Sequence, residues 1–235
     1  MRAILLAAGM GTRLRPITLE TPKSLVEVNG KPMIETQIEF LREKGINEII
    51  IVTGYLNEKF EYLKSKYGVI LVHNEKYNVY NNIYTMNLVK DYLPGSYVID
   101  ADIYLNKNFI DNNIVKSTYF SGYKEGFKDE WILEFDGNDK VYDIRVGDDE
   151  GYILCGVSYW NEQDGNIIVE KLEEAINNGD FENLYWDNIV KDNIDILDVR
   201  IRKINSDDCF EIDSVEDLNK VNQYILSKVS KENED

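Results

Sequence analysis

The sequence predicts an α/β protein, in which a Rossmann-like, mostly parallel sheet is flanked by helices and carries an antiparallel β extension. Short apolar runs such as Ala3–Ala8 have the character of strands that are buried on both faces. Segments with apolar residues at helical spacing alternate with these runs, which favours parallel strands joined by right-handed crossovers. Between residues 117 and 160, short β-prone runs are separated by Gly, Asp and Asn turns, as in antiparallel strands.

The first half of the chain predicts strands and helices in alternation. Pro32 is favoured in a first helical turn, and Gly45 and Gly68 can end helices because glycine adopts a left-handed conformation readily. The expected elements are strands at residues 3–8, 49–52, 69–72 and 97–100, a helix from Pro32 to Gly45, and a short helix capped by Asn57 that stops at Gly68.

The second half predicts the antiparallel extension, three helices and a further strand. Ser214 and Asp217 form a capping box that begins the last helix. The last five residues are expected to fray. The other expected elements are β runs at 118–123, 131–135, 140–146 and 152–160, helices at 162–178 and 184–192, and a strand at 196–203.

The composition limits the classes of partner. With 26 basic and 43 acidic residues the formal net charge is −17, which argues against nucleic acid, since nucleic-acid-binding proteins carry a basic surface. Residues 1–31 are an exception, with five basic and two acidic residues, and this local excess suits a small polyanion held at one site.

The same data indicate where the protein works. The N-terminal apolar run is too short for a signal peptide or a membrane span, and two cysteines are too few for a disulfide framework. The chain has no linker, repeat or low-complexity tract. We therefore expect a cytoplasmic protein without membrane insertion, built as a single domain over residues 1–235.

A glycine-rich loop, Gly9-Met10-Gly11, follows the first strand. Glycines at such a place let backbone N–H groups approach a phosphate closely. The loop is not a dinucleotide-binding fingerprint, because Leu14 stands where the third glycine would be. It is not a P-loop either, because no Gly-Lys-Ser/Thr follows. Arg13 and Lys23 supply positive charge next to the loop.

The loop and its surroundings resemble the signature of a known superfamily. Leu6-Ala7-Ala8-Gly9-Met10-Gly11-Thr12-Arg13-Leu14 and Thr21-Pro22-Lys23 are similar to the signature of the nucleoside-diphosphate-sugar pyrophosphorylases. Within that superfamily the chain resembles the bacterial CTP:phosphocholine cytidylyltransferases. The eukaryotic-type cytidylyltransferases use a His-x-Gly-His motif, which a chain whose only histidine is His73 cannot supply. The segments behind the narrower resemblance are 80–84, 99–102, 184–188 and 211–214.

The resemblance implies a magnesium-dependent transfer from CTP to phosphocholine that yields CDP-choline and pyrophosphate. It places Lys23 at the α-phosphate and Arg13 at the leaving pyrophosphate. Asp102, at the end of a strand, matches the metal aspartate of the family, and Mg²⁺ prefers such oxygen ligands. The second metal ligand is Asp213, with Asp187 as a competitor for that role.

The resemblance also divides the substrates between the two halves of the domain. Residues 1–116 form the nucleotide-binding half, and residues 117–235 form the acceptor-binding half with the C-terminal helix, so that the antiparallel extension covers the acceptor. The expected nucleotide contacts are Leu6, Ala7, Ala8, Gly9, Gly11 and Thr12, with Asn81 and Asn82 reading the pyrimidine.

Choline carries a quaternary ammonium, which donates no hydrogen bond and is recognised by aromatic faces and nearby carboxylates. The candidate acceptor-binding residues are Tyr80, Trp131, Tyr185, Trp186 and Asp187. Two other hypotheses remain open at this point. The same chemistry could act on 2-aminoethylphosphonate, inositol phosphate or a sugar 1-phosphate, or the chain could be a non-catalytic nucleotide-binding regulatory subunit.

Overall fold

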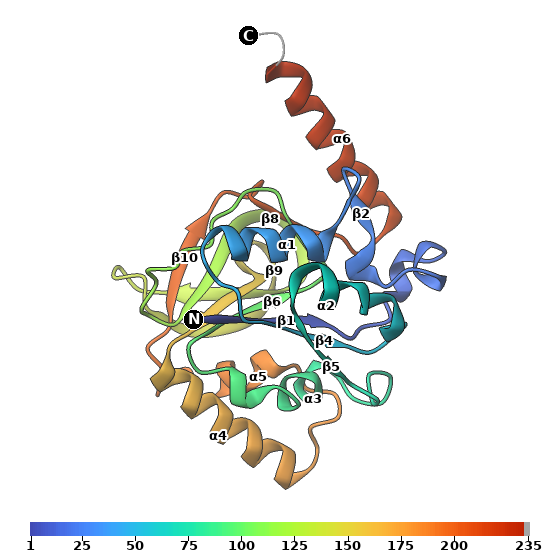
Figure 1. Ribbon diagram of the computed structural model, residues 1–235. Coiled ribbons are helices and arrows are strands. Elements are labelled where there is room, and N and C mark those ends of the chain that lie inside the picture. The colour runs from blue at the N-terminus through green and yellow to red at the C-terminus, as the bar shows by residue number, and fades with distance from the viewer. Residues whose placement is uncertain (233–235) are drawn as a thin grey trace.

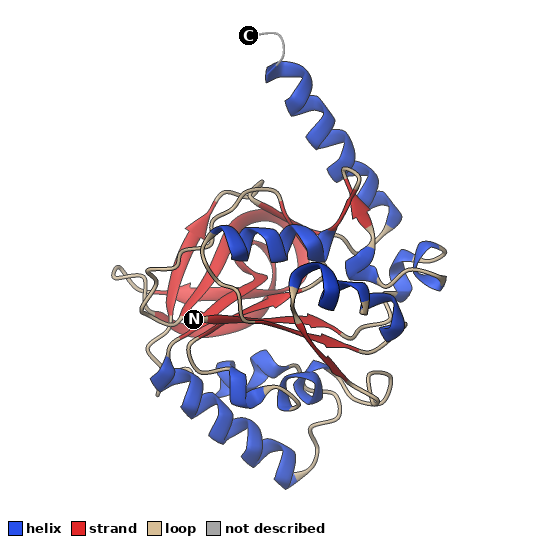
Figure 2. Cartoon of the chain, viewed as in Figure 1, coloured by secondary structure: helices blue, strands red, loops and turns tan. Residues whose placement is uncertain are grey.

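A seven-stranded sheet with helices on both faces forms the centre of the computed structural model, which describes residues 1–232 (Figures 1 and 2). Its strand order is β10-β8-β9-β6-β1-β4-β5. Strands β6, β1, β4 and β5 run parallel, β9 is antiparallel to both β6 and β8, and β10 is parallel to β8. The expected fold class is therefore confirmed. The strands are β1 (Arg2–Ala7), β4 (Ile49–Thr53), β5 (Ile70–His73), β6 (Ser96–Asp100), β8 (Thr118–Phe135), β9 (Val141–Trp160) and β10 (Arg200–Ile204).

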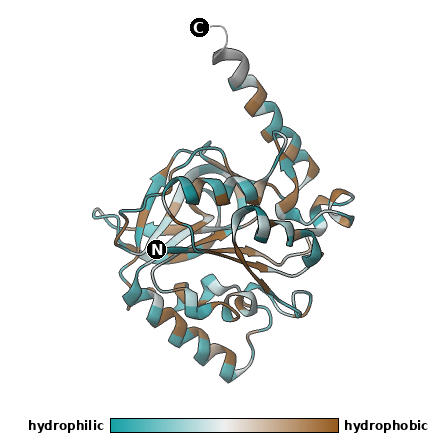
Figure 3. Ribbon diagram, viewed as in Figure 1, coloured by the Kyte–Doolittle hydropathy of each residue, from teal (hydrophilic) through white to brown (hydrophobic). Residues whose placement is uncertain are grey.

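Helices cover both faces of this sheet, which is why its central strands are apolar throughout (Figure 3). Ala3 and Leu5 pack into the core beneath α1, whereas Ile4, between them, packs into the core on the opposite face, because successive strand residues point to opposite sides. One face carries α1 (Met33–Glu43) and α2 (Tyr62–Tyr67), and the other carries α3 (Asn82–Asn87), α4 (Glu162–Asn178) and α5 (Trp186–Asp192) (Figure 1).

The antiparallel extension is one long hairpin of β8 and β9, where the sequence predicted four short runs. Several Gly and Asp residues that read as turns lie inside these strands with positive φ, including Gly126, Asp129 and Asp149. The pairing register shifts near them, so these residues form bulges that bend the hairpin. Residues from both strands of the hairpin line the cavity described below, among them Val157 and Ser158, which also pair with β6.

Smaller elements complete the fold, and two expectations about helix starts were wrong. Pro32 is extended and caps α1 from outside, and Leu56, with φ of 51°, precedes the turn that Asn57 was expected to cap. The sequence did not predict α3, nor the pairing of β7 with β11. The small strands are β2 (Glu27–Val28), β3 (Lys31–Pro32), β7 (Ile103–Leu105) and β11 (Cys209–Glu211). The single 3₁₀ turns are η1 (Thr12–Leu14), η2 (Ile17–Leu19), η3 (Lys23–Leu25), η4 (Asn57–Phe60) and η5 (Lys90–Tyr92).

Helix α6 (Val215–Glu232) is the last of the described elements and projects away from the sheet (Figure 1). Its capping box is confirmed, because the Ser214 hydroxyl accepts from the Asp217 N–H at 3.1 Å while the Asp217 carboxylate accepts from the Ser214 N–H at 2.9 Å. Of the five residues expected to fray, the last three lie outside the described residues. Within residues 1–232, no helix has both the length and the apolar character needed to cross a membrane.

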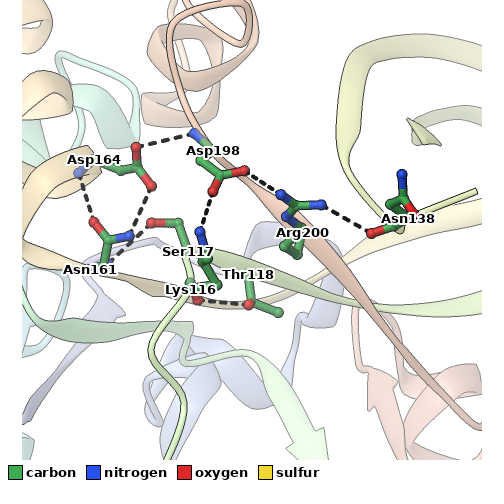
Figure 4. Close-up of polar contacts among 8 residues, drawn as sticks. All are labelled: Lys116, Ser117, Thr118, Asn138, Asn161, Asp164, Asp198 and Arg200. Carbon is green, nitrogen blue, oxygen red and sulfur yellow. Dashed lines mark hydrogen bonds and ion pairs between the residues drawn. The ribbon is translucent and has the colours of Figure 1, made fainter. Parts of the chain in front are cut away.

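A polar network fixes the second half of the sheet to α4 (Figure 4). The Asp164 carboxylate, 2% exposed, accepts from the Asp198 N–H at 3.2 Å and from the Asn161 amide at the same distance. Asp198 in turn holds Lys116 and Arg200, at 2.6 and 2.8 Å. Since buried polar groups are stable only when bonded, this network defines how β8, β10 and α4 meet.

Candidate active site

A cavity of about 600 Å³ opens where the carboxyl ends of β1 and β6 meet the β8–β9 hairpin. Ligands of open α/β sheets bind at this end of the strands. Both halves of the chain contribute to its wall. Of the residues singled out from the sequence, those that line it are Leu6, Ala8, Gly9, Arg13, Asn82, Asp102, Trp131, Tyr185, Trp186, Asp187 and Asp213.

The glycine loop opens one side of this cavity. A Cβ atom on Gly9 would meet no atom within 4 Å, so the backbone there is open to an approaching ligand. Gly11 has a φ of 58°, and a Cβ on it would lie 2.8 Å from Lys23 Cβ. Glycine at this position therefore lets Lys23 pack against the loop. Ala7 faces the core instead, and Thr12 begins η1.

Lys23 lies at the centre of a charged cluster. Its ammonium is 2.7 Å from the Asp102 carboxylate and also hydrogen-bonds to Asp213, while the Arg13 guanidinium lies 2.7 Å from the other oxygen of Asp213. Burial opposes the charge on Lys23, but the two carboxylates outweigh it and raise the pKa of the ammonium. The Lys23 side chain is 12% exposed and that of Arg13 73%, so Lys23 is fixed and Arg13 reaches into solvent.

A third carboxylate, Glu211, completes the cluster, and the sequence interpretation did not assign it. Carboxylate oxygens of Asp102, Glu211 and Asp213 lie within 4.8 Å of one another. Strand β11 brings Glu211 there, and the Ile212 N–H donates to the Asp102 carbonyl at 3.3 Å. An all-oxygen carboxylate set suits a hard divalent cation. Glu211 lies two residues before Asp213 in the sequence.

Crowding of like charges affects the protonation of this cluster. Desolvation of the Glu211 carboxyl by the surrounding protein raises the pKa of this group to about 7. The neighbouring charges of Asp213 and Asp102 act in the same direction. Burial also raises the pKa of Asp213, but Lys23 and Arg13 outweigh this effect and leave the pKa below its usual value. A cation placed among the three carboxylates would relieve their repulsion, so the residues fit a divalent metal ion.

Asp187 lies apart from the three clustered carboxylates and has a different environment. Its carboxylate accepts a hydrogen bond from the Tyr119 hydroxyl at 2.7 Å. Burial raises the pKa of Asp187 to about 6, although the bond from Tyr119 acts in the opposite direction. Asp100, at the end of β6, also faces the cavity, and burial with the charges of Asp102 and Asp187 raises its pKa. The geometry thus favours Asp213 over Asp187 as a metal ligand.

Aromatic side chains form another part of the cavity wall. The rings of Trp131 and Tyr185 lie 6.1 Å apart at 78°, and Trp131 comes from the hairpin while Tyr185 precedes α5. Trp186 is 3% exposed and packs edge-on against Trp160 at 5.7 Å. Trp131 and Tyr185 are therefore the aromatic residues best placed to present faces to a cation in the cavity.

Of the remaining candidates, Tyr80 and Asn81 support the wall, whereas Asn82 lines the cavity. Tyr80 packs between Tyr84 and Phe181, at 5.0 Å from each ring. Asn81 caps α3, its carbonyl oxygen accepting from the Asn82 N–H at 2.8 Å. Asn82 lines the cavity and accepts from the Trp186 N–H at 2.8 Å, which connects the expected nucleotide and acceptor sides.

Two lysines of the hairpin, Lys124 and Lys128, also line the cavity. Sequence reasoning missed them because they are single charges between the β runs predicted at 118–123 and 131–135, where a lysine is usually solvated. Together with Arg13 they give the cavity wall three cationic side chains, and Lys23 contacts Asp102 and Asp213, two of the carboxylates that line it. The site can therefore hold phosphate groups close to carboxylates and aromatic rings.

Comparison with known proteins agrees with this arrangement. Residues 2–110 match the nucleotidyl transferase family. The chain is 54% identical over 228 residues to the choline-phosphate cytidylyltransferase of Streptococcus pneumoniae, an alignment that covers 97% of this chain and 100% of the relative. It is 41% identical over 233 residues to the enzyme of the same name from Haemophilus influenzae, covering 98% and 100%. A solved structure of the Streptococcus pneumoniae CTP:phosphocholine cytidylyltransferase superposes with a TM-score of 0.94 at 54% identity, over 95% of this chain and 98% of that one.

Proposed function

Because this chain belongs to the nucleotidyl transferase family, among the choline-phosphate cytidylyltransferases, we propose that it transfers the cytidylyl group of CTP to phosphocholine and releases pyrophosphate. The observation that carries the proposal is one cavity in which Lys23 bridges Asp102 and Asp213 while Trp131 and Tyr185 face it from the other half of the chain. A phosphate-binding cluster and a cation-binding wall in one cavity match the two ends of phosphocholine.

The metal requirement follows from the carboxylates. Members of the family use a divalent metal ion, and we propose that it is Mg²⁺, held by Asp102, Glu211 and Asp213. When bound, such an ion supplies neutralisation of phosphate charge. The protein holds these carboxylates in place through β11 and the turn after β6.

The side chains of the protein perform alignment and charge neutralisation. The acceptor's phosphate oxygen attacks the α-phosphorus of CTP and pyrophosphate leaves, so no covalent intermediate on the protein is needed. Lys23, fixed by two carboxylates, faces the α-phosphate, and the more exposed Arg13 follows the leaving pyrophosphate. Such preorganised cations act on charge that develops in the transition state.

The two substrates occupy different parts of the single domain. We assign CTP to residues 1–116, with the glycine loop at its phosphates and Asn81 and Asn82 at the pyrimidine. Residues 117–235 take phosphocholine, whose trimethylammonium group lies against the Trp131 and Tyr185 side chains, with the Asp187 carboxylate in the same cavity. Since CTP is a cytoplasmic nucleotide, we propose that the protein works in the cytoplasm.

The other hypotheses are not favoured. A non-catalytic subunit has no need of Lys23, Arg13 and three clustered carboxylates, and the two relatives described above, at 54% and 41% identity, are choline-phosphate cytidylyltransferases. Pyrophosphate release should be measured with CTP, UTP, dTTP and ATP as donors and with phosphocholine, 2-aminoethylphosphonate, inositol phosphate and a sugar 1-phosphate as acceptors. We expect CTP with phosphocholine to give the highest kcat/KM. Turnover of 2-aminoethylphosphonate without turnover of phosphocholine would exclude the choline assignment.

A further inference from the structure

The two cysteines of the chain, far apart in sequence, meet in the wall of the active-site cavity. Cys155 lies on β9 and Cys209 is the first residue of β11. Both residues line the cavity, and their thiols lie within interaction range of each other. A pair of adjacent thiols differs from two inert cysteines, because one can react with the other.

A bulge in β9 directs Cys155 toward this partner. Tyr119 on β8 pairs with Ser158, but Ser121 pairs with Leu154, so the segment between them on β9 is longer than its partner. Gly156, within the segment, has a φ of 68°. Bulges change the direction of a side chain, and the Cys155 thiol donates to the Phe120 carbonyl at 2.9 Å.

Strand β11 carries both Cys209 and Glu211, a member of the charged cluster. Cys209 and Glu211 are two residues apart on one strand, so their side chains project to the same side. Glu211 belongs to the cluster of three carboxylates. A covalent bond at Cys209 would therefore restrain the strand that positions Glu211.

We propose that Cys155 and Cys209 form a redox-sensitive dithiol that a hydroperoxide converts into an intramolecular disulfide, which restrains β11 against β9 and lowers turnover. One thiol attacks the peroxide oxygen, giving a sulfenic acid and releasing water when hydrogen peroxide is the oxidant. The second thiol attacks the sulfenic sulfur, forming the S–S bond and releasing a second water. The two sulfurs are oxidised and the peroxide is reduced. The effect on turnover rests on the proposed function, whereas formation of the bond does not.

The test uses the full-length protein, folded and treated with hydrogen peroxide. Remaining thiols are blocked with iodoacetamide, and the non-reduced digest is analysed by mass spectrometry. We expect a peptide pair that joins Cys155 to Cys209 with the loss of two hydrogen atoms. Turnover should fall by up to about a hundredfold, as for ångström-scale misplacement of active-site groups, and dithiothreitol should restore it.

Single variants separate this bond from other oxidation. Cys155→Ser and Cys209→Ser should each lose the linked peptide and retain their own untreated turnover after peroxide, whereas methionine oxidation would inactivate them as well. Separately oxidised cysteines without a link, a link between two chains, or a link that forms only in urea would overturn the proposed dithiol. A linked protein with unchanged turnover would overturn its effect on activity. If the protein shows no cytidylyltransferase activity, the proposed function is refuted. Mass spectrometry of the oxidised protein still decides whether the disulfide forms.

Discussion

Replacing Asp187 with asparagine should stabilise the protein while weakening acceptor binding. The half-buried Asp187 carboxyl is desolvated by the surrounding protein, which raises its pKa from 3.8 to about 6, so that it is charged at pH 7.5. A difference of about two pKa units corresponds to about 3 kcal/mol of unfavourable free energy for the charged form at neutral pH. Asparagine keeps an oxygen that can accept the bond from Tyr119, so the charge is removed without leaving the hydroxyl unpaired.

The stability gained in Asp187→Asn should depend on pH. Because the folded state holds the Asp187 proton more tightly than the unfolded state, the stability contributed by this group is complete below about pH 4 and is lost as the pH rises through about 6. The gain in unfolding free energy from Asp187→Asn should therefore reach about 3 kcal/mol at pH 7.5 and fall to about 0.5 kcal/mol at pH 4.

Urea unfolding without ligands, measured at both pH values, tests this reasoning. The exposed Asp195 nearby provides a matched control, since Asp195→Asn should change the unfolding free energy by no more than about 0.5 kcal/mol. The KM for phosphocholine should rise in Asp187→Asn and not in Asp195→Asn. Loss of stability in Asp187→Asn at pH 7.5, or a gain of equal size at both pH values, would refute the account of a desolvated charge.

Three further substitutions test the roles of individual side chains. Lys23→Met should lower kcat by about 10²–10³-fold, as for loss of one transition-state contact, with Lys59→Met as an exposed control; wild-type turnover would remove Lys23 from the mechanism. Trp131→Ala should raise the KM for phosphocholine roughly 2- to 30-fold, equivalent to about 0.5–2 kcal/mol, while Trp131→Phe retains most of the affinity; an equal rise in the KM for CTP would contradict an acceptor role. Glu211→Gln should raise the half-saturating Mg²⁺ concentration at least about tenfold, or about 1.4 kcal/mol, and an unchanged Mg²⁺ dependence would exclude Glu211 as a ligand.

Local sequence patterns predicted the elements that are stabilised by contacts between residues close in the sequence. The apolar run that became β1 and the capping box of α6 depend on neighbouring residues alone, and both are present. Asp102 was found because it follows a recognisable strand. By contrast, α3 has only six residues and no marked periodicity, and its N-terminus depends on the Asn81 cap.

Features that depend on long-range pairing were missed. Gly126 and Asp149 have residue types typical of turns, and only the partner strand shows that they are bulges within β8 and β9. Glu211 reaches Asp102 because β11 pairs with β7, over a hundred residues away in the sequence. A three-residue strand carries too little pattern to predict that pairing.

The most direct test of the central claim is a competition between acceptors in one reaction. Purified protein, Mg²⁺ and CTP are mixed with equal concentrations of phosphocholine and phosphoethanolamine, and the products are identified by mass spectrometry. In this account, the charged cluster binds the triphosphate and the aromatic residues of the cavity select a quaternary ammonium. CDP-choline should therefore predominate in the wild-type reaction, and this preference should be smaller in Trp131→Ala. The absence of any cytidylated product, or equal amounts of the two products from the wild-type protein, would contradict the account.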